Sequence, residues 1–224
     1  MTPFPTPPPL TRTWLLGLSA VTLLALGVRL PVIGAHSFWY DEAVTQQLIR
    51  KPTHDILNGS ARDNGNPPLY LLAARGWQQA VGPGDDGLRG FSLLCSVATV
   101  AALGALGRRL GGPAVGLAAA ALYAASPLSV EFAHEARTYA LLHLLAVVNV
   151  WWFVLALSHD RPWDWAGYAA TMFLAWYSHY YAAFLPLSHV LVLAVLPWRS
   201  RRWLAWAAAT GAASVAWATW LPTF

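Results

Sequence analysis

Two adjacent carboxylates are the first residues in this chain that could do chemistry. Asp41 and Glu42 follow an apolar segment almost directly, in Ser37-Phe-Trp-Tyr-Asp-Glu-Ala43. Ser37 could cap a short helix, and the helix dipole favours acidic residues in a first turn. That structural explanation accounts for one carboxylate more easily than for two beside three aromatic residues. A carboxylate placed here could also act as a general base.

A second group of ionisable residues lies in a break between two apolar segments. The break reads Ser126-Pro-Leu-Ser-Val-Glu-Phe-Ala-His-Glu-Ala-Arg-Thr-Tyr139. If it is helical, Glu131, His134 and Glu135 share one face, and a Glu-x-x-His pair can ligate a metal. The plainer explanation is that polar residues mark a loop. Because ionisable groups near hydrocarbon are costly, we interpret the break as a candidate functional site.

Three further motifs have both a structural and a functional explanation. Tyr177-Ser-His-Tyr-Tyr181 could belong to an aromatic belt at a membrane surface, or its His and Tyr hydroxyls could face a polar cavity. Arg29 could extend to the interface, or hold a phosphate or carboxylate. Asn66-Pro-Pro-Leu69 is typical of a rigid turn that aims the following helix.

These residues must be positioned by membrane helices, because the composition excludes a soluble protein. Only 11% of the 224 residues are charged and 57% are hydrophobic, whereas soluble domains carry about 25% charged residues. The net charge of +4 does not indicate nucleic-acid binding, because the arginines lie in short breaks between apolar segments. The single cysteine, Cys95, has no partner, so we expect no disulfide.

The apolar segments predict an all-α polytopic membrane protein with about seven transmembrane helices. Helices that cross a bilayer need roughly 17 to 25 residues. Residues 1–13 are rich in proline and predicted to be disordered, and residues 14–224 form one membrane module with an outer loop at 35–90. The predicted spans are Trp14–Ile33, Phe91–Gly107, Pro113–Val130, Thr138–Leu157, Trp163–Tyr177, Tyr180–Pro197 and Trp203–Pro222.

The segment Leu69–Val81 decides the topology. Its polar residues Arg75, Gln78 and Gln79 share one helix face, which favours an amphipathic helix in the interface over a span. With seven spans the N-terminus is cytoplasmic, and the arginines at 12, 108, 109, 161, 199, 201 and 202 all face the cytoplasm, as the positive-inside rule requires. Eight spans satisfy that rule about as well. The two topologies place the acidic pair 41–42 on opposite sides of the membrane.

The order of the motifs along the chain is more specific than any one of them. Trp-Tyr-Asp-Glu-Ala is followed by Asn-Pro-Pro-Leu, Leu-Arg-Gly-Phe at 88–91, Gly-Arg-Arg-Leu-Gly-Gly at 107–112, His-Glu-Ala-Arg-Thr-Tyr-Ala-Leu and Tyr-Ser-His-Tyr. From Arg29 to about Pro222 this series resembles the GT-C membrane glycosyltransferases. It is most similar to the family 39-like branch of protein O-mannosyltransferases and lipid A aminoarabinose transferase.

The resemblance implies a multi-pass enzyme of the inner or plasma membrane with its active site on the extracytoplasmic face. Its donor would be a sugar on a polyprenyl phosphate, and its acceptor a hydroxyl of a lipid, glycan or protein. The family's acidic motif falls on Asp41 and Glu42, and its Glu-Ala-Arg element on Glu135 and Arg137, with His134 where Gln is common. Relatives usually carry a further C-terminal part. The resemblance also favours seven spans.

The chemistry of such a transfer suggests a role for each residue. The leaving phosphate is a weak base, so the reaction needs a general base and a cation that balances the phosphate charge. We expect Asp41 to be the base, Glu42 to orient the acceptor or a metal, and Arg137 to hold phosphate. No cofactor is assigned, and a divalent metal is compatible with this set. The remaining expected donor-binding residues are Arg89, His134, Glu135, Tyr139 and His179.

Two other functions are compatible with a polytopic chain. One is a catalytically incomplete fragment or scaffold of such an enzyme, and the other is a transporter subunit. Transporters often carry ionisable residues within their spans. Here the predicted spans are nearly free of charge, and eight of the ten acidic residues lie in segments that the seven-span topology places on one side. That distribution favours surface chemistry on a lipid-linked substrate.

Overall fold

The structure is a computed structural model that describes residues 4, 8–34, 37–64, 66–195 and 200–220. All secondary structure in these residues is helical. The elements in chain order are α1 (Arg12–Arg29), the 3₁₀ turn η1 (Leu30–Val32), α2 (Tyr40–Leu48), α3 (Thr53–Asn64), α4 (Leu69–Val81), α5 (Asp85–Gly111), α6 (Pro113–Ala125), α7 (Pro127–Ala133), α8 (Tyr139–His159), α9 (Pro162–Trp176), the 3₁₀ turn η2 (Tyr180–Ala183), α10 (Phe184–Val195) and α11 (Ser200–Ala218).

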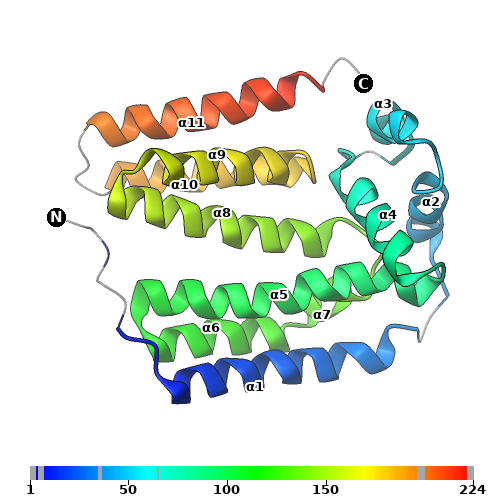
Figure 1. The fold of residues 1–224 in the computed structure, drawn as a ribbon, viewed down its shortest axis with the longest axis horizontal. Helices are drawn as coiled ribbons and strands as arrows, with labels where there is room; N and C mark the ends of the chain where they lie inside the picture. Colours follow the sequence, from blue (N-terminus) through cyan, green and yellow to red (C-terminus); the bar gives the residue numbers. More distant parts are fainter. Residues whose placement is uncertain (1–3, 5–7, 35–36, 65, 196–199, 221–224) are drawn as a thin grey trace.

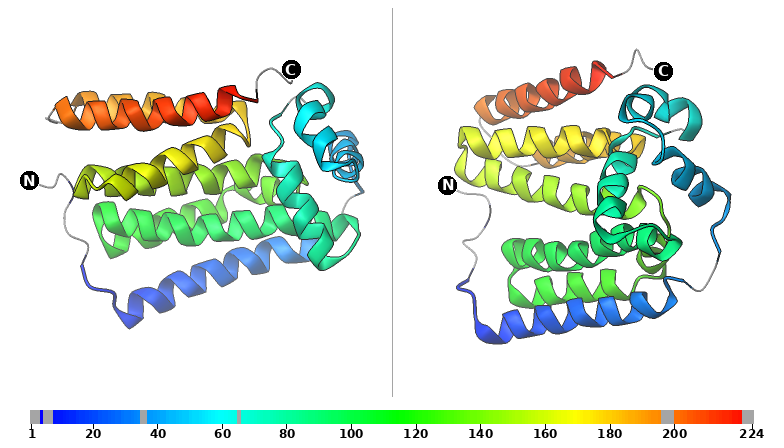
Figure 2. Two further views of the ribbon diagram at one scale, coloured as in Figure 1. Left: turned by 45° about the horizontal axis from the view of Figure 1, so that its top comes forward. Right: turned by 45° about the vertical axis from the view of Figure 1, so that its right-hand side comes forward.

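The helices form a bundle with a cap at one end. Helices α1, α5, α6, α8, α9, α10 and α11 lie side by side with nearly parallel axes, and α2, α3 and α4 gather across one end of them (Figures 1 and 2). We call this end the α2–α4 end. Buried Leu71 and Ala74 of α4 pack with Leu88 of α5 and Ala140 of α8 in one apolar cluster. The cap is therefore fixed to the bundle by a hydrophobic core.

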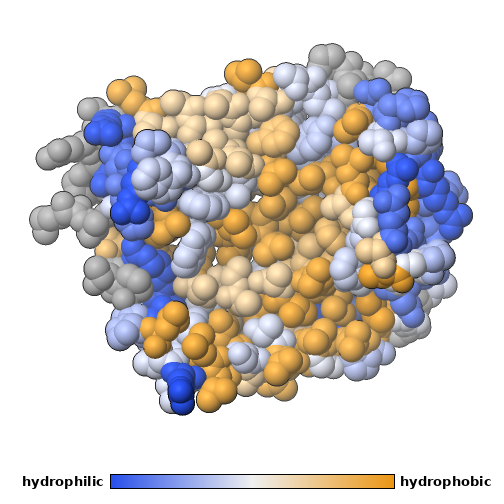
Figure 3. Space-filling view, viewed as in Figure 1, coloured by the Kyte–Doolittle hydropathy of each residue, from blue (hydrophilic) through white to orange (hydrophobic). Residues whose placement is uncertain are grey.

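The face of the bundle seen in Figure 3 is apolar. Figure 3 shows hydrophobic residues across the middle of the molecule and hydrophilic residues at its two ends. Leu16, Leu122 and Val215 are among the large hydrophobic side chains that are exposed. A continuous apolar surface of this kind is suited to lipid and not to water. The expectation of an all-α membrane protein is confirmed.

The expected count of seven spans is not established by helix length. Among the described residues, Arg12–Val32, Asp85–Gly111 and Tyr139–His159 are long and apolar enough to cross a membrane. The bent pair α6–α7 would be a fourth span. Helices α9 and α10 have 15 and 12 residues, fewer than the roughly 20 that a straight span needs.

Some expected boundaries hold and others shift. Leu69–Val81 is confirmed as a helix with those bounds, and glycines with positive φ at 82 and 84 separate it from α5. The predicted span Phe91–Gly107 is the centre of the longer α5, which begins at Asp85. Of the segment 1–13 that is predicted to be disordered, residues 1–3 and 5–7 lie outside the described ones, and α1 already begins at Arg12.

The predicted span Pro113–Val130 is broken at Ser126. Pro127 has no backbone N–H to continue the helix, and the residue before a proline disfavours helical backbone angles. Ser126 accordingly has φ −66° and ψ 122°, and α6 and α7 meet at a bend of 63°. Helix α7 then ends at Ala133, so Glu131, His134 and Glu135 do not share one helix face as the sequence suggested.

Arg29 donates to carbonyl groups at the end of α6, next to this break. Its side chain is fully buried, and Nη1 donates to the Ala124 carbonyl at 3.0 Å. Nη2 donates to the Tyr123 carbonyl at 3.4 Å and to Ser129 Oγ at 2.8 Å. The five N–H donors of a guanidinium suit this task. The sequence suggested an interfacial or phosphate-binding role for Arg29, and the structure instead places it inside the bundle.

Candidate active site

A buried ion pair joins α2 to α5 at the α2–α4 end. Arg89 Nε donates to Glu42 Oε1 at 2.8 Å, and Arg89 Nη2 donates to Oε2 at 2.7 Å. The Glu42 residue is 1% exposed. The backbone N–H of Ala136 also donates to Oε1, at 2.8 Å. Glu42 thus ties α2 both to α5 and to the segment between α7 and α8.

Arg89 also holds the chain that leads into α2. Its Nη1 donates to the Ile33 carbonyl at 3.0 Å, and its Nη2 donates to the Ser37 carbonyl at 3.3 Å. The guanidinium carbon lies 4.9 Å from the centroid of the Phe38 ring, a cation–π distance. The structure therefore places Arg89 beneath α2, where its donors face Glu42 and backbone carbonyls.

The first turn of α2 gives its two carboxylates different directions. The helix begins at Tyr40 with Trp39 as its N-cap residue, so the cap is not Ser37 as the sequence suggested. Glu42 reaches back to accept from the Trp39 N–H at 3.4 Å. Consecutive residues of an α-helix point about 100° apart, since 3.6 residues make one turn. The side chain of Asp41 therefore points in a different direction from that of Glu42, which binds Arg89.

Asp41 faces Arg137 from the segment between α7 and α8. Asp41 Oδ2 lies 3.5 Å from Arg137 Nη2, longer than the roughly 2.7–2.9 Å of a close charge-assisted hydrogen bond. The Asp41 side chain is 35% exposed and that of Arg137 is 8% exposed. The structure thus brings these two predicted site residues side by side. It also places an accessible carboxylate directly beside a buried guanidinium.

Glu135 adds a third carboxyl group to this cluster. Burial, and then the negative charges of Glu131 and Glu42, raise its pKa to about 7, although the positive charge of Arg137 acts in the opposite direction. Its Oε2 atom is inaccessible to solvent and has no hydrogen-bond partner within the described part of the chain. At neutral pH this carboxyl group is therefore partly protonated.

His179 and Tyr139 border the cluster, whereas His134 turns away from it. The ring of His179 lies 5.7 Å from that of Tyr139. Burial, and then the charge of Arg137, lower the pKa of His179. His134 Nε2 instead lies 2.7 Å from the Arg29 carbonyl, and burial lowers its pKa. Of the predicted site residues, His134 is therefore the one that contacts α1.

Hydrogen bonds fix the two segments that carry these side chains. Thr138 Oγ1 donates to the Ser178 carbonyl at 3.0 Å, which joins the Glu-Ala-Arg segment to the start of η2. The Leu69 N–H donates to the Tyr177 carbonyl at 3.0 Å, which joins α4 to the same place. Hydrogen bonds to the backbone carbonyls of residues 177 and 178 thus bring together motifs that are far apart in the sequence.

The contacts of the cluster residues do not favour a metal site. Within the described residues, no three side chains of His, Cys, Asp or Glu come together in a way that would hold a metal ion. Both oxygens of Glu42 accept from Arg89, and His134 Nε2 faces a carbonyl group. The Glu131–His134 metal pair considered from the sequence is therefore not formed, because α7 ends between these residues.

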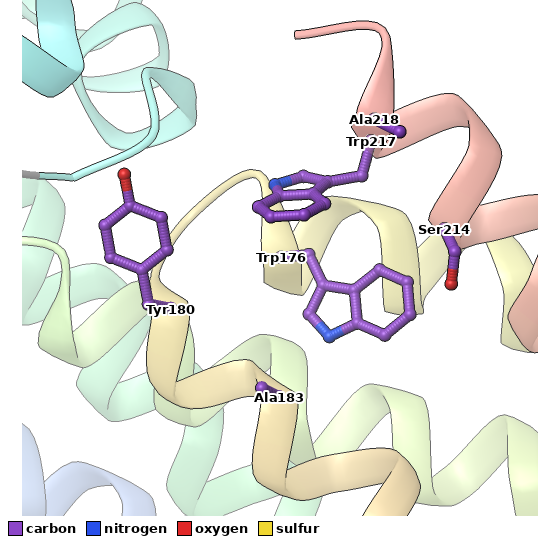
Figure 4. A pocket seen from close by; sticks show the side chains of 6 residues that line it. All are labelled: Trp176, Tyr180, Ala183, Ser214, Trp217 and Ala218. Carbon is purple, nitrogen blue, oxygen red and sulfur yellow. The ribbon is translucent and has the colours of Figure 1, made fainter. Parts of the chain in front are cut away.

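An apolar groove with a volume of about 450 Å³ lies between α9, η2 and α11. Figure 4 shows its lining, in which the indoles of Trp176 and Trp217 face the space from α9 and α11 and Tyr180 lies across from them. Tyr180 directly follows His179, which borders the cluster. Sequence reasoning missed this groove, although the tryptophans themselves were visible. The remaining lining residues are Ala183, Ser214 and Ala218.

Comparison with known proteins identifies the family. Residues 65–223, more than half of the chain, match the model of a family described as dolichyl-phosphate-mannose-protein mannosyltransferase. The chain belongs to this family. Membership in the mannosyltransferase family makes it a membrane glycosyltransferase of GT-C type. The matched segment contains Arg89, Glu135 and Arg137 and begins after the acidic pair at 41–42. No curated protein matches the chain.

Proposed function

We propose that the chain transfers a sugar from a polyprenyl-phosphate donor to an acceptor hydroxyl at the α2–α4 end of the bundle. The observation that carries this proposal is the pairing of accessible Asp41 with buried Arg137, 3.5 Å apart. A general base and a phosphate-binding cation are the two groups that this reaction needs. Their place at the end of an apolar bundle suits a donor whose phosphate is attached to a lipid.

The proposed reaction uses these two groups in one displacement. The Asp41 carboxylate takes the proton of the acceptor hydroxyl as its oxygen bonds to the anomeric carbon. The bond between that carbon and the phosphate oxygen breaks, and the phosphate keeps the electron pair. Arg137 balances the charge that grows on the phosphate, for which a guanidinium is suited by its bidentate geometry. His179 and Tyr139 border the same space.

We assign Glu42 and Arg89 to positioning and not to substrate binding. Both oxygens of Glu42 accept hydrogen bonds from Arg89, and Oε1 accepts one more from the backbone of Ala136. The residue is buried, so an acceptor or a metal would have to displace these bonds. The pair fixes the start of α2, and this start decides the direction of Asp41.

The apolar groove is the proposed site for the isoprenoid chain of the donor. It begins at Tyr180, one residue from His179, and runs between the indoles of Trp176 and Trp217. A volume of about 450 Å³ lies within the roughly 300–1,000 Å³ of typical ligand sites. A phosphate at Arg137 and a lipid chain in this groove would be adjacent parts of one molecule.

The assay that tests this function uses membranes that contain the chain and a radiolabelled sugar on a long or a short polyprenyl phosphate. We expect label to reach an acceptor from both donors. Trp217→Ala should raise KM about tenfold for the long donor, the effect of losing about 1.4 kcal/mol of apolar contact, and leave the short donor nearly unchanged.

The control for this variant is Trp163→Ala, which removes an exposed tryptophan at the start of α9. It should leave both KM values unchanged. An equal rise of KM for long and short donors in Trp217→Ala would contradict the groove assignment. Absence of transfer from every polyprenyl-phosphate sugar would contradict the proposed function itself.

We further propose seven spans with the α2–α4 end outside the cytoplasm. The arginines at 108, 109, 161 and 201 lie at helix ends opposite to the α2–α4 end, as the positive-inside rule expects of a cytoplasmic face. Helix α4 runs across the bundle end (Figure 1), and Arg75 on its polar face donates to the Lys51 carbonyl at 2.8 Å. These features favour an interfacial α4 over an eighth span.

Cysteine labelling tests this topology. His54→Cys at the start of α3 should react with an impermeant reagent added outside, and Arg161→Cys before α9 should react only after the membrane is opened. Both native residues are exposed, and the native Cys95 is buried, so background labelling should be low. Equal labelling of the two positions from one side would contradict the seven-span proposal.

A further inference from the structure

The Glu135 carboxyl group has no role in the displacement proposed above. It lies two residues before Arg137, yet neither the Asp41–Arg137 pair nor the Glu42–Arg89 pair includes it. Its Oε2 atom is inaccessible to solvent and lacks a hydrogen-bond partner within the described residues. A buried carboxylate oxygen without a partner is costly, whereas a neutral carboxyl group in the same place costs much less.

The charges around Glu135 favour its neutral form. Glu131 at the end of α7 and the acidic pair of α2 all oppose a negative charge on it. Arg137 is the cation that acts on it, and the charge of Arg137 is already close to Asp41 at 3.5 Å. His134 beside it and His179 across the cluster both have lowered pKa values, so neither adds a compensating positive charge at neutral pH.

We propose that Glu135 is a protonated carboxyl group that donates a hydrogen bond to the phosphate of the sugar donor, next to the guanidinium of Arg137. This inference rests on the proposed function. The two carboxyl groups of the site then have opposite roles, since partly exposed Asp41 accepts a proton and partly buried Glu135 keeps one. Pairs of acids in different environments divide in this way in other catalytic sites.

The proposal predicts how transfer depends on pH. The neutral form of the Glu135 carboxyl group predominates below pH 7 and is lost as pH rises, because its pKa is about 7. Wild-type transfer should therefore fall about tenfold between pH 6 and pH 8, the ratio of the protonated fractions at these two values. Glu135→Gln keeps an N–H donor that does not titrate, so its rate should stay near the pH 6 wild-type rate throughout.

Glu135→Ala is the matched variant without a donor. It should transfer slowly at both pH values, with a raised KM for the donor. Three results would overturn the proposal: Glu135→Gln as slow as Glu135→Ala, an unchanged fall in rate with pH in Glu135→Gln, or a wild-type rate in Glu135→Ala. The first of these would mean that the ionised carboxylate is the required form.

Thermal unfolding of the detergent-solubilised protein tests the protonation without any transfer. The pKa of Glu135 is about 7 in the folded chain and 4.5 for an unperturbed glutamate, so folding is weakened as pH rises from the lower value to the higher one. The Tm of Glu135→Gln should therefore exceed that of the wild type by more at pH 8 than at pH 5. A Tm difference that is independent of pH would overturn the proposal even if transfer is never detected. A pH-dependent Tm difference without any transfer would contradict only the proposed function.

Discussion

Asp41→Asn is expected to lower the rate of sugar transfer by about 10² to 10⁴-fold, the usual contribution of a general base. The change is nearly isosteric and removes the proton-accepting charge. Because the side chain of Asp41 is 35% exposed and its partner lies at 3.5 Å, the loss of this pair should have little effect on folding. The amount of protein in the membrane should therefore match that of the wild type. Transfer of radiolabel from a polyprenyl-phosphate sugar measures the effect.

Two further variants show whether the loss belongs to this carboxylate. Asp55→Asn removes an exposed carboxylate in the first turn of α3, at the same end of the bundle, and should transfer at the wild-type rate. Arg137→Lys keeps the charge but loses the fork geometry, so we expect a raised donor KM and a smaller loss of rate than in Asp41→Asn. Wild-type transfer by Asp41→Asn would exclude Asp41 as the base.

The convergence of Asp41 with Arg137 could be predicted from the sequence because it follows from topology. Both residues come directly after or before an apolar helix, and the ends of antiparallel helices meet at the two surfaces of a bundle. The helix at 69–81 was likewise predictable, since its polar residues repeat with helical spacing. These features depend on the order and periodicity of residues, which a single sequence contains.

The different surroundings of Asp41 and Glu42 could not be predicted, because adjacent carboxylates look equivalent in a sequence. The difference depends on where α2 begins and on the direction from which Arg89 approaches. The role of Arg29 was hidden for a similar reason, because the bend at Ser126 creates the carbonyl acceptors that it contacts. The groove is formed by side chains from three separate segments, and their packing sets its volume.

The second large effect is expected at the buried pair. Arg89→Met should lower the free energy of unfolding by about 3–5 kcal/mol, the usual effect of removing one partner of a buried ion pair. Methionine fills much of the space of the arginine stem, so the main consequence is an uncompensated charge on Glu42, which is 1% exposed. Denaturant unfolding of the purified protein in detergent measures the change.

Neutralising Glu42, the partner of Arg89, separates the effect of the lost charge on stability from the effect of the lost side-chain shape. Glu42→Gln in the Arg89→Met background removes the isolated buried charge and keeps an acceptor for the Ala136 N–H, so the double variant should regain much of the lost stability. Its transfer rate should remain low, because Arg89 also holds the Ile33 and Ser37 carbonyls that lead into α2 and so fixes the direction of Asp41. A double variant that recovers both stability and transfer would show that the bidentate pair is dispensable for placing the base. A double variant no more stable than Arg89→Met would show that the loss comes from packing and not from an unpaired charge.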